Sequence, residues 1–450
     1  MTTIEKRLER LLAGPDEPAR EFIVSRYTYA DIYALAAGFR ETFSAPDLAG
    51  APVCLCTEDR GLIAAALLAS LAGGPVCVLP YAITAPVLAE TRAATGFRNA
   101  VTDRAGEVPD GARVLAPGRG EWKRTGPAET RGLDSIFFQM FTGGSTGRPK
   151  LWSKTPVNLF SEAAYLADRY RYRAGDIVAA TVPPYHIYGL LFSVLAPFLA
   201  GASVLEPLYV FPREILSVLR DGGVTTLVSV PLHYRSLNGA AISAPRLKRA
   251  FSSAGPLERS DGVYFHGRTG VGVEEIYGST ETGGIASRCP AAGREILEPF
   301  DCIEWKITDE RLCVRSPFVS PDLPVDGGGY YLTGDRVEPA GAGGFSLLGR
   351  ADGIVKVGGK RVDLNEVREK IMGVPGVRDA YLFSREGRRG ADISAVIESD
   401  AAEAGIRERL PGLLEPYALP RRIRIVRKIP STSTGKYDRE SIMALFAEKE

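Results

Sequence analysis

A glycine- and hydroxyl-rich run of nine residues, TGGSTGRPK from Thr142 to Lys150, has the composition of a loop that binds polyphosphate, and it follows the apolar run SIFFQMF. Three glycines, Gly143, Gly144 and Gly147, allow a tight turn with its backbone N–H groups pointing inward. The side chains that can contact phosphate are three hydroxyl groups and one ammonium, those of Thr142, Ser145, Thr146 and Lys150. The spacing is not that of a Walker A loop. Taken alone, the run is also compatible with a surface turn.

Five further motifs follow this loop in order: PPYHIYG (183–189), IYGSTETGG (276–284), YYLTGD (330–335), LLGRADGIVKVGGKRV (347–362) and PSTSTGKYDR (430–439). With the loop, they resemble the adenylate-forming superfamily of acyl-CoA synthetases, aryl-acid ligases, luciferases and peptide-synthetase adenylation domains. The resemblance extends over about two thirds of the chain. A P-loop NTPase is disfavoured, because neither Walker A spacing nor a Walker B context accompanies the loop.

Length and composition restrict the classes of partner. A chain of 450 residues is expected to form two domains. Its formal net charge is +1 and it has no basic run, which argues against nucleic acid as the main partner. The six cysteines lack metal-ligand spacing and are expected to be buried thiols in a reducing cytoplasm. The apolar run 62–83 is interpreted as a buried helix (62–71), a Gly-Gly-Pro turn and a buried strand (76–79), so no membrane span is expected.

Strand-like runs alternate with helical patterns, which predicts a large layered α/β domain with mostly parallel strands. From residue 350 the pattern changes to α+β, with a helix expected over 365–371 and strands over 379–383 and 393–397. The predicted domains are therefore 1–349, an adenylation core, and 350–450, a small mobile domain joined to it by a hinge.

The resemblance implies a two-step reaction. A carboxylate attacks the α-phosphorus of ATP to give an acyl-adenylate and pyrophosphate, and a thiol then attacks the activated carbonyl. The protein must hold two anions in line and stabilise the charge that develops on phosphate. By the same resemblance, the loop 142–150 cradles the β and γ phosphates. It departs from the usual pattern at Gly143 and at Ser145-Thr146, where relatives more often carry Ser and Thr-Thr.

Each later motif also receives roles from the resemblance. Tyr277 lies against adenine, Thr280 binds the α-phosphate, and Glu281 holds Mg²⁺, whose oxygen shell suits one carboxylate plus phosphates. Asp335 and Arg350 bind the ribose. His186 gates the passage between the acyl and thiol sites, whereas His233 and His266 are expected to be pocket-wall or core residues.

The resemblance also implies roles for four C-terminal positions, one in the first step, one at the hinge and two in the second step. Lys436 bridges the carboxylate and the α-phosphate in the first step only. Asp352 is the hinge about which the small domain rotates. After rotation, Gly359 and Arg361 line the channel for the pantetheine arm of the thiol substrate, and glycine lets a ligand pass close to the backbone.

The acid to be activated is expected to be aromatic or short. The run PPYHIYGLLF contains no aspartate to pair with an amino-acid ammonium, and an unpaired buried cation would be costly. The HIYG string resembles the aryl and hydroxycinnamate ligases, and this resemblance implies an acyl pocket lined by Tyr188, Phe192, Ser253, Gly255, Pro256 and Gly283.

Some alternatives stay open at this point. Coenzyme A and a phosphopantetheinyl carrier protein present the same thiol, and a non-thiol acceptor is possible on the same fold. A non-catalytic adenylate-binding or scaffold protein is disfavoured because Glu281, Asp335, Arg350 and Lys436 are all present. The protein is expected to be a monomer or a homodimer.

Overall fold

The computed structural model describes residues 3–48, 50–103, 108, 111–116, 118–123, 131–142, 150–341, 343–357, 360–387, 390–432 and 435–446. The chain packs as two compact units. The first comprises Met1–Glu304 and Arg315–Gly329, and the second Trp305–Val314 and Tyr330–Glu450. Segments before residue 350 thus pack with the C-terminal residues, and the division by packing lies earlier than the predicted one. The predicted hinge at Asp352 remains a prediction.

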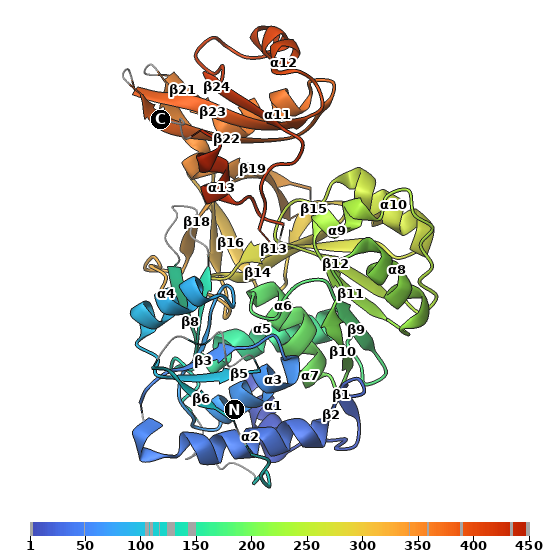
Figure 1. Cartoon of the computed structure of the whole chain (residues 1–450), viewed down its shortest axis with the longest axis vertical. Coiled ribbons are helices and arrows are strands. Elements are labelled where there is room, and N and C mark those ends of the chain that lie inside the picture. The colour runs from blue at the N-terminus through green and yellow to red at the C-terminus, as the bar shows by residue number, and fades with distance from the viewer. Residues whose placement is uncertain are drawn as a thin grey trace. The chain divides into compact units, whose positions relative to one another are not determined.

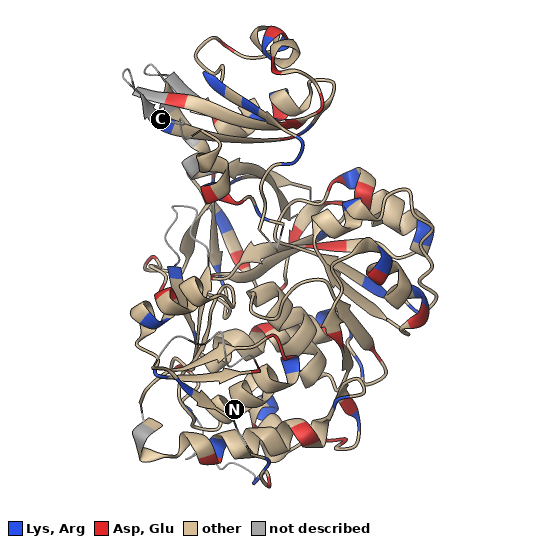
Figure 2. Cartoon of the chain, in the orientation of Figure 1, with Lys and Arg blue, Asp and Glu red and all other residues tan. Residues whose placement is uncertain are grey.

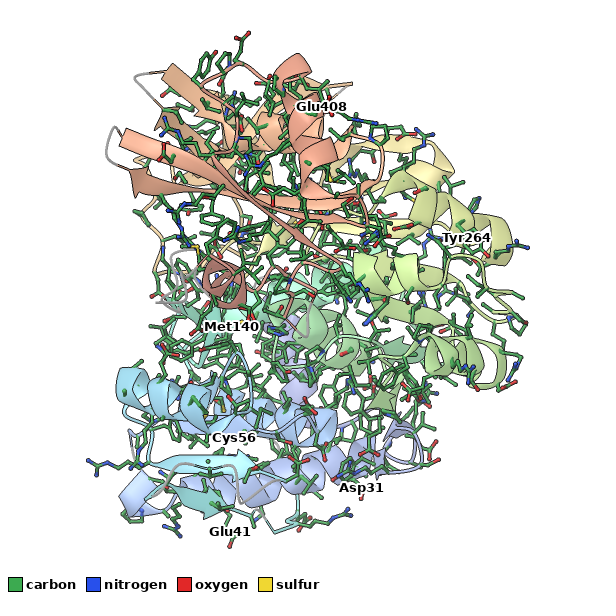
Figure 3. All side chains as sticks on the ribbon, turned by 45° about the horizontal axis from the view of Figure 1, so that its top comes forward. Asp31, Glu41, Cys56, Met140, Tyr264 and Glu408 are labelled. Carbon is green, nitrogen blue, oxygen red and sulfur yellow. The ribbon has the colours of Figure 1, made fainter. Side chains whose placement is uncertain are left out.

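The first unit contains a sheet in the order β6-β5-β3-β4-β7-β8. Its strands are β3 (Val53–Cys56), β4 (Cys77–Leu79), β5 (Asn99–Thr102), β6 (Arg113–Leu115), β7 (Phe138–Thr142) and β8 (Lys150–Lys154). All neighbours in it are parallel except β7 and β8. Cys56 on β3 and Met140 on β7 mark this sheet in Figure 3. Its central strand β3 is buried throughout, as expected for a parallel strand covered on both faces.

A second group of strands in this unit has the order β15-β14-β13-β12-β11-β9-β10-β1-β2. The strands are β1 (Glu21–Ile23), β2 (Tyr27–Thr28), β9 (Ile177–Ala180), β10 (Ser203–Leu208), β11 (Thr226–Ser229), β12 (Arg249–Ser252), β13 (Val273–Ser279), β14 (Gly283–Cys289) and β15 (Arg294–Pro299). From β1 through β10, β9, β11 and β12 to β13 every neighbouring pair is parallel. The carboxyl ends of these strands therefore share one edge.

Helices accompany both sheets (Figure 1). They are α1 (Thr3–Ala13), α2 (Tyr29–Phe43), α3 (Arg60–Leu71), α4 (Ala85–Thr95), α5 (Pro156–Arg169), α6 (Ile187–Leu190), α7 (Ala196–Leu199), α8 (Pro212–Asp221), α9 (Pro231–Ser236) and α10 (Arg259–Thr269). Short helical turns are η1 (Pro46–Leu48), η4 (Leu191–Leu195) and η5 (Pro290–Ala292). One apolar core packs α8, α9 and α10 against β11, β12 and β13, with Tyr234 and Phe265 at its centre.

The second unit has three groups of strands, ordered β16-β17-β18-β19, β20-β21 and β22-β23-β24. They are β16 (Glu304–Thr308), β17 (Arg311–Arg315), β18 (Tyr331–Ala340), β19 (Gly344–Arg350), β20 (Ile354–Val357), β21 (Lys360–Asp363), β22 (Val377–Gly387), β23 (Gly390–Ser399) and β24 (Arg422–Val426). Its helices are η6 (Ala351–Gly353), α11 (Leu364–Met372), α12 (Glu403–Arg409), η7 (Leu410–Gly412) and α13 (Arg439–Ala444). Residues of α11, α12 and the three-stranded sheet form its core.

The structure confirms the predicted α/β class with a smaller C-terminal sheet, and the local predictions within it. The helix expected over 62–71 is α3 and the strand expected over 76–79 is β4. In the described part of the chain, no helix is long and apolar enough to cross a membrane. Five cysteines are buried as expected, and Cys302 is half-buried. Acidic and basic residues alternate along α2, α8 and α10 (Figure 2), in keeping with the low net charge.

Candidate active site

Three segments of the first unit that carry predicted site residues lie at the carboxyl edge of its larger parallel sheet. Residues 181–186 follow β9, residues 253–256 follow β12, and residues 280–282 follow β13. The register places these strands side by side, with Ala250 opposite Val273 and Val228 opposite Ala180. Ligands of open α/β sheets bind outside such carboxyl ends. The topology thus brings together segments that lie about a hundred residues apart in sequence.

The phosphate-loop motif joins β7 to β8. Thr142 and Lys150 are partners in the antiparallel register of these strands, so the chain leaves and re-enters the sheet at one place. Trp152 donates from Nε1 to the Thr142 hydroxyl at 3.1 Å. The predicted phosphate-binding residues between them, Gly143, Gly144, Ser145, Thr146 and Gly147, lie outside the described residues.

A tight turn between β13 and β14 carries Thr280 and Glu281, both half-buried. The hydroxyls of Ser279 and Thr282 lie 2.9 Å apart across the turn, and each accepts a bond from the other residue's backbone N–H. Gly283 has φ +71°, and a Cβ there would lie 2.6 Å from Phe318 and 2.7 Å from Glu162. Packing therefore accounts for this glycine, which the sequence placed on the acyl pocket.

Two buried charged residues, Glu162 and Lys154, lie near this turn, and neither was singled out from the sequence. Glu162 on α5 accepts the backbone N–H of Gly284 at 2.6 Å. Lys154, at the end of β8, donates to the carbonyl of Phe318 at 2.8 Å and is 0% exposed. Burial lowers the pKa of Lys154 to about 8, opposed by the charges of Glu162, Glu281 and Asp322. Burial likewise raises the pKa of Glu162, opposed by Lys154 and the Gly284 bond.

The donors at this turn fit a magnesium ion held jointly with phosphate. Glu281 supplies a carboxylate and Thr280 a hydroxyl, and both are hard oxygen donors on a half-exposed turn. Among the described residues, no three His, Cys, Asp or Glu side chains cluster as a metal site. A single carboxylate suits Mg²⁺, which keeps water and substrate phosphate as its other ligands.

The HIYG motif begins a helix that changes its hydrogen-bond pattern. His186 precedes α6, which passes into the π-helical turn η4 and then α7. Such π-turns occur often at functional sites. Gly189 is required by packing, since a Cβ there would lie 2.1 Å from the carbonyl oxygen of Pro183. His186 is half-buried and its ring lies 4.8 Å from that of Tyr185.

Tyr188 and Phe192 belong to one aromatic cluster with different exposure. Their rings are 5.0 Å apart, and Phe192 lies 4.9 Å from Phe251. Tyr188 is half-buried, whereas Phe192 is only 2% exposed. Phe192 thus stands in the apolar core, and Tyr188 is partly exposed as a residue although its hydroxyl oxygen is buried.

The segment after β12 turns away from the sheet at Ala254, which has φ +72°. Ser253 is half-buried and donates to the carbonyl of Ile276 at 2.9 Å, which ties this segment to β13. Gly255 and Pro256 are exposed. This arrangement brings Ser253 next to the strand that carries Tyr277, which is itself half-buried.

His233 is a buried residue of the same sheet edge, in line with the expectation of a pocket-wall or core position. Its Nδ1 lies 2.6 Å from the hydroxyl of Thr181, which lies 2.8 Å from that of Ser229. Burial lowers the pKa of His233, so the ring is neutral at physiological pH. It joins the ends of β9 and β11.

In the second unit, Asp335 on β18 is the direct partner of Arg350 on β19 in the antiparallel register. Asp335 is half-buried, and its backbone N–H donates to the Thr333 hydroxyl at 3.2 Å. The two residues expected to bind ribose are thus neighbours in space.

Asp352 lies in η6, the short helical turn that begins directly after Arg350, and the hairpin β20-β21 follows this turn. Arg361 is on β21, opposite Lys356. Gly359 lies outside the described residues. Arg336 forms a 2.7 Å ion pair with Asp363, so an ionic contact joins residues on either side of the predicted hinge.

Lys436 is exposed on a short hairpin before α13. The backbone of Thr432 donates to the Lys436 carbonyl at 2.7 Å, and Ser431 pairs with Tyr437 as an isolated bridge. Gly435, with φ +77°, permits the tight turn.

We predict that Lys154→Met changes the pH dependence of stability. The folded-state pKa of about 8 lies below the ordinary lysine value of 10.5. Between these pH values the folded wild type has lost a proton that the unfolded chain still holds, so its free energy of unfolding rises with pH. Relative to the variant, the wild type should gain about 1 kcal/mol per pH unit from pH 8 to 10. Urea unfolding at several pH values measures this difference.

The control for that experiment is Lys428→Met, which removes an exposed lysine. Its difference from wild type should not depend on pH. A pH-independent difference for Lys154→Met as well would contradict the burial of a titrating ammonium.

The comparisons with known proteins agree with this architecture. The model of the family "AMP-binding enzyme" matches residues 9–321. A 4-coumarate–CoA ligase of Rhodobacter capsulatus is 31% identical over 305 residues, covering 66% of this chain and 73% of that protein. A sulfoacetate–CoA ligase of Cupriavidus necator is 27% identical, covering 69% of this chain and 67% of that protein.

The fold is shared with a solved structure over nearly the whole length. The crystal structure of ATP-bound MatB from Rhodopseudomonas palustris has a TM-score of 0.83 at 23% identity, covering 98% of this chain and 99% of that one. Because the family match takes in well over half of the residues, the chain belongs to the AMP-binding enzymes, and the fold, the family and the class of enzyme predicted from its motifs, an AMP-forming acid–thiol ligase, are confirmed.

Proposed function

We propose that this protein activates an aromatic or short carboxylic acid with ATP and transfers the acyl group to a pantetheine thiol. The observation that carries the proposal is the turn with Thr280 and Glu281, which stands at the carboxyl edge of the parallel sheet beside the segments of Ser253 and His186. Polar donors for phosphate and an aromatic wall for an acyl group meet there.

The first step needs charge stabilisation rather than an enzyme nucleophile. The acid's carboxylate oxygen bonds to the α-phosphorus, and pyrophosphate leaves with the electron pair of the broken bond. Thr280 donates to the α-phosphate, and Lys436 neutralises both anions while they approach each other. Glu281 would hold Mg²⁺, which screens the charge of the phosphates when bound.

The acid's identity is inferred from the HIYG segment. The run 183–192 contains no acidic residue, so an α-amino acid would leave its ammonium unpaired. Tyr188 is a half-buried aromatic residue in contact with Phe192, and a planar acyl group packs well against aromatic rings. The 31% identical relative is a ligase for 4-coumarate, an aromatic acid.

The acceptor thiol is inferred from the relatives, and the cellular compartment from the cysteines. Both relatives described above are CoA ligases by name, which favours coenzyme A, and a carrier protein would present the same thiol. The buried free thiols fit a reducing cytoplasm. A monomer or a homodimer is the expected assembly.

We predict that, with coenzyme A supplied as the thiol, the protein converts ATP to AMP and pyrophosphate only when both Mg²⁺ and a carboxylic acid are present. The acid supplies the attacking oxygen, the thiol releases AMP from the acyl-adenylate, and Mg²⁺ held at Glu281 would screen the charge of the phosphates. Nucleotide products resolved by anion-exchange chromatography check this. ADP as the product, or turnover without added acid, would contradict the proposed reaction.

We predict further that aromatic or short unsaturated acids support faster ATP–pyrophosphate exchange than long-chain acids or amino acids, because of Tyr188 and the missing counter-charge. A panel of acids at equal concentration measures the order. An amino acid as the best substrate would overturn this assignment.

Lys436→Ala is expected to lose the first half-reaction alone. Removing one preorganised charge costs about a hundredfold to a thousandfold in rate. A supplied acyl-adenylate should still react with the thiol at the wild-type rate. Lys428→Ala, an exposed lysine on the same unit, is the control.

Gly359→Trp should show the opposite pattern, because an indole would fill the proposed thiol channel while exchange continues. Equal loss of both half-reactions in each variant, with folding intact by circular dichroism, would contradict the alternation of the small domain about Asp352.

A further inference from the structure

We propose that Tyr437 is a positioning residue for the first half-reaction, because it fastens the Lys436 hairpin to β22 and α11 through Asp379 and Arg368. This inference rests on the proposed function. It concerns the residue next to the lysine, for which the motif assigned no role.

The Tyr437 hydroxyl contacts two charged side chains, although the residue is 37% exposed. Its oxygen lies 2.9 Å from Oδ1 and 3.0 Å from Oδ2 of Asp379 on β22. Arg368 on α11 donates to Asp379 Oδ1 at 2.7 Å and lies 3.3 Å from the Tyr437 hydroxyl. The three side chains therefore form a closed hydrogen-bonded triangle.

Both other members of the triangle are fixed by the backbone. Arg368 also donates from Nε to the carbonyl of Ala380 at 2.7 Å, and Asp379 also accepts the N–H of Ala380 at 2.8 Å. The Tyr437 ring lies 4.9 Å from that of Tyr381, two residues further along β22. Bonds to a charged carboxylate are stronger than neutral ones. The triangle is thus a rigid point of attachment rather than a passing surface contact.

The geometry of the hairpin relates this attachment to Lys436. Tyr437 pairs with Ser431 in extended backbone, where successive side chains point to opposite sides. Lys436 directly precedes Tyr437 and is exposed, so the contacts of Tyr437 fix the backbone from which the Lys436 side chain extends. The Lys436 carbonyl also accepts the N–H of Thr432 at 2.7 Å, which fixes the backbone on its other side.

The hydroxyl of Tyr437 stays a donor at any ordinary assay pH. Burial, with the nearby charge of Asp379, raises its pKa to about 12, while Arg368 opposes the shift. Asp379 therefore keeps its partner throughout the range in which the enzyme would be assayed.

Loss of the Tyr437 contacts should slow the first half-reaction and leave the thiol half-reaction unchanged. Without its anchor the Lys436 ammonium samples many positions, and a misplacement of about 1 Å can cost about a hundredfold in rate. The thiol half-reaction does not use Lys436 in the proposed scheme, so it should not change. A tyrosine that merely stabilised the fold would affect both halves alike, or only the melting temperature.

The experiment compares Tyr437→Phe with wild type. The substitution keeps the ring beside Tyr381 and removes only the hydroxyl. We expect the kcat of ATP–pyrophosphate exchange to fall by about tenfold to a hundredfold with little change in KM for ATP. Thioester formation from supplied acyl-adenylate should keep the wild-type rate. Tyr417→Phe, at a ring 40% exposed on the same unit, is the matched control and should leave both rates unchanged.

A second variant tests the triangle itself. Asp379→Asn should reduce exchange similarly, and combining it with Tyr437→Phe should add little, because both remove one interaction. Additive losses, an unchanged exchange rate for Tyr437→Phe, or equal loss in both half-reactions would each overturn the proposal. If the wild type itself lacks exchange with every acid, the proposed function fails, and this inference falls with it.

Discussion

The hydrogen bond from the Gly284 backbone to the buried carboxylate of Glu162 is the interaction on which the candidate site depends. It fixes the start of β14 against α5, directly after the turn that carries Thr280 and Glu281. Glu162 and Lys154 lie in an interior where an isolated charge is costly. Glu162 contacts the backbone at the start of β14, whereas Lys154 donates to the carbonyl of Phe318.

The same constraint accounts for the glycines of the motif. Gly283 needs a positive φ and lies against Glu162 and Phe318, where a Cβ would approach within 2.7 Å. A Cβ at Gly284 would lie only 2.8 Å from the ring of Phe300, so packing leaves no room for a side chain at this position. The motif YGSTETGG therefore combines two demands, since Thr280 and Glu281 are the residues proposed to contact the ligand and the two glycines allow the chain to pack closely against Glu162 of α5.

Much of this could be predicted from the sequence because the motif residues are local signals. The spacing of YGSTETGG and TGD indicated which positions carry polar groups, and the alternating apolar runs indicated a parallel sheet. Strand register places Asp335 opposite Arg350, and the binding of ribose by these two residues stays a prediction. The α11 helix was expected over 365–371 and spans Leu364–Met372.

Other features depend on distant contacts that leave no local pattern. A lysine in a strand is normally assigned to the surface, and only the approach of Phe318, 164 residues away, shows that Lys154 is buried. The partners of Tyr437 come from α11 and β22, 58 and more residues earlier. Likewise, residues 305–314 pack with the C-terminal unit because β17 pairs with β18, although the two strands are separated by residues 316–330.

The central claim, attack of a carboxylate on the α-phosphorus, is tested most directly by isotope transfer. The acid, with both carboxylate oxygens replaced by ¹⁸O, is incubated with the enzyme, ATP, Mg²⁺ and coenzyme A, and the AMP is examined by mass spectrometry. Thiol attack at the carbonyl leaves the bridging oxygen on phosphorus, so each AMP should carry one ¹⁸O and pyrophosphate none. Label in pyrophosphate, or AMP without label, would contradict the account.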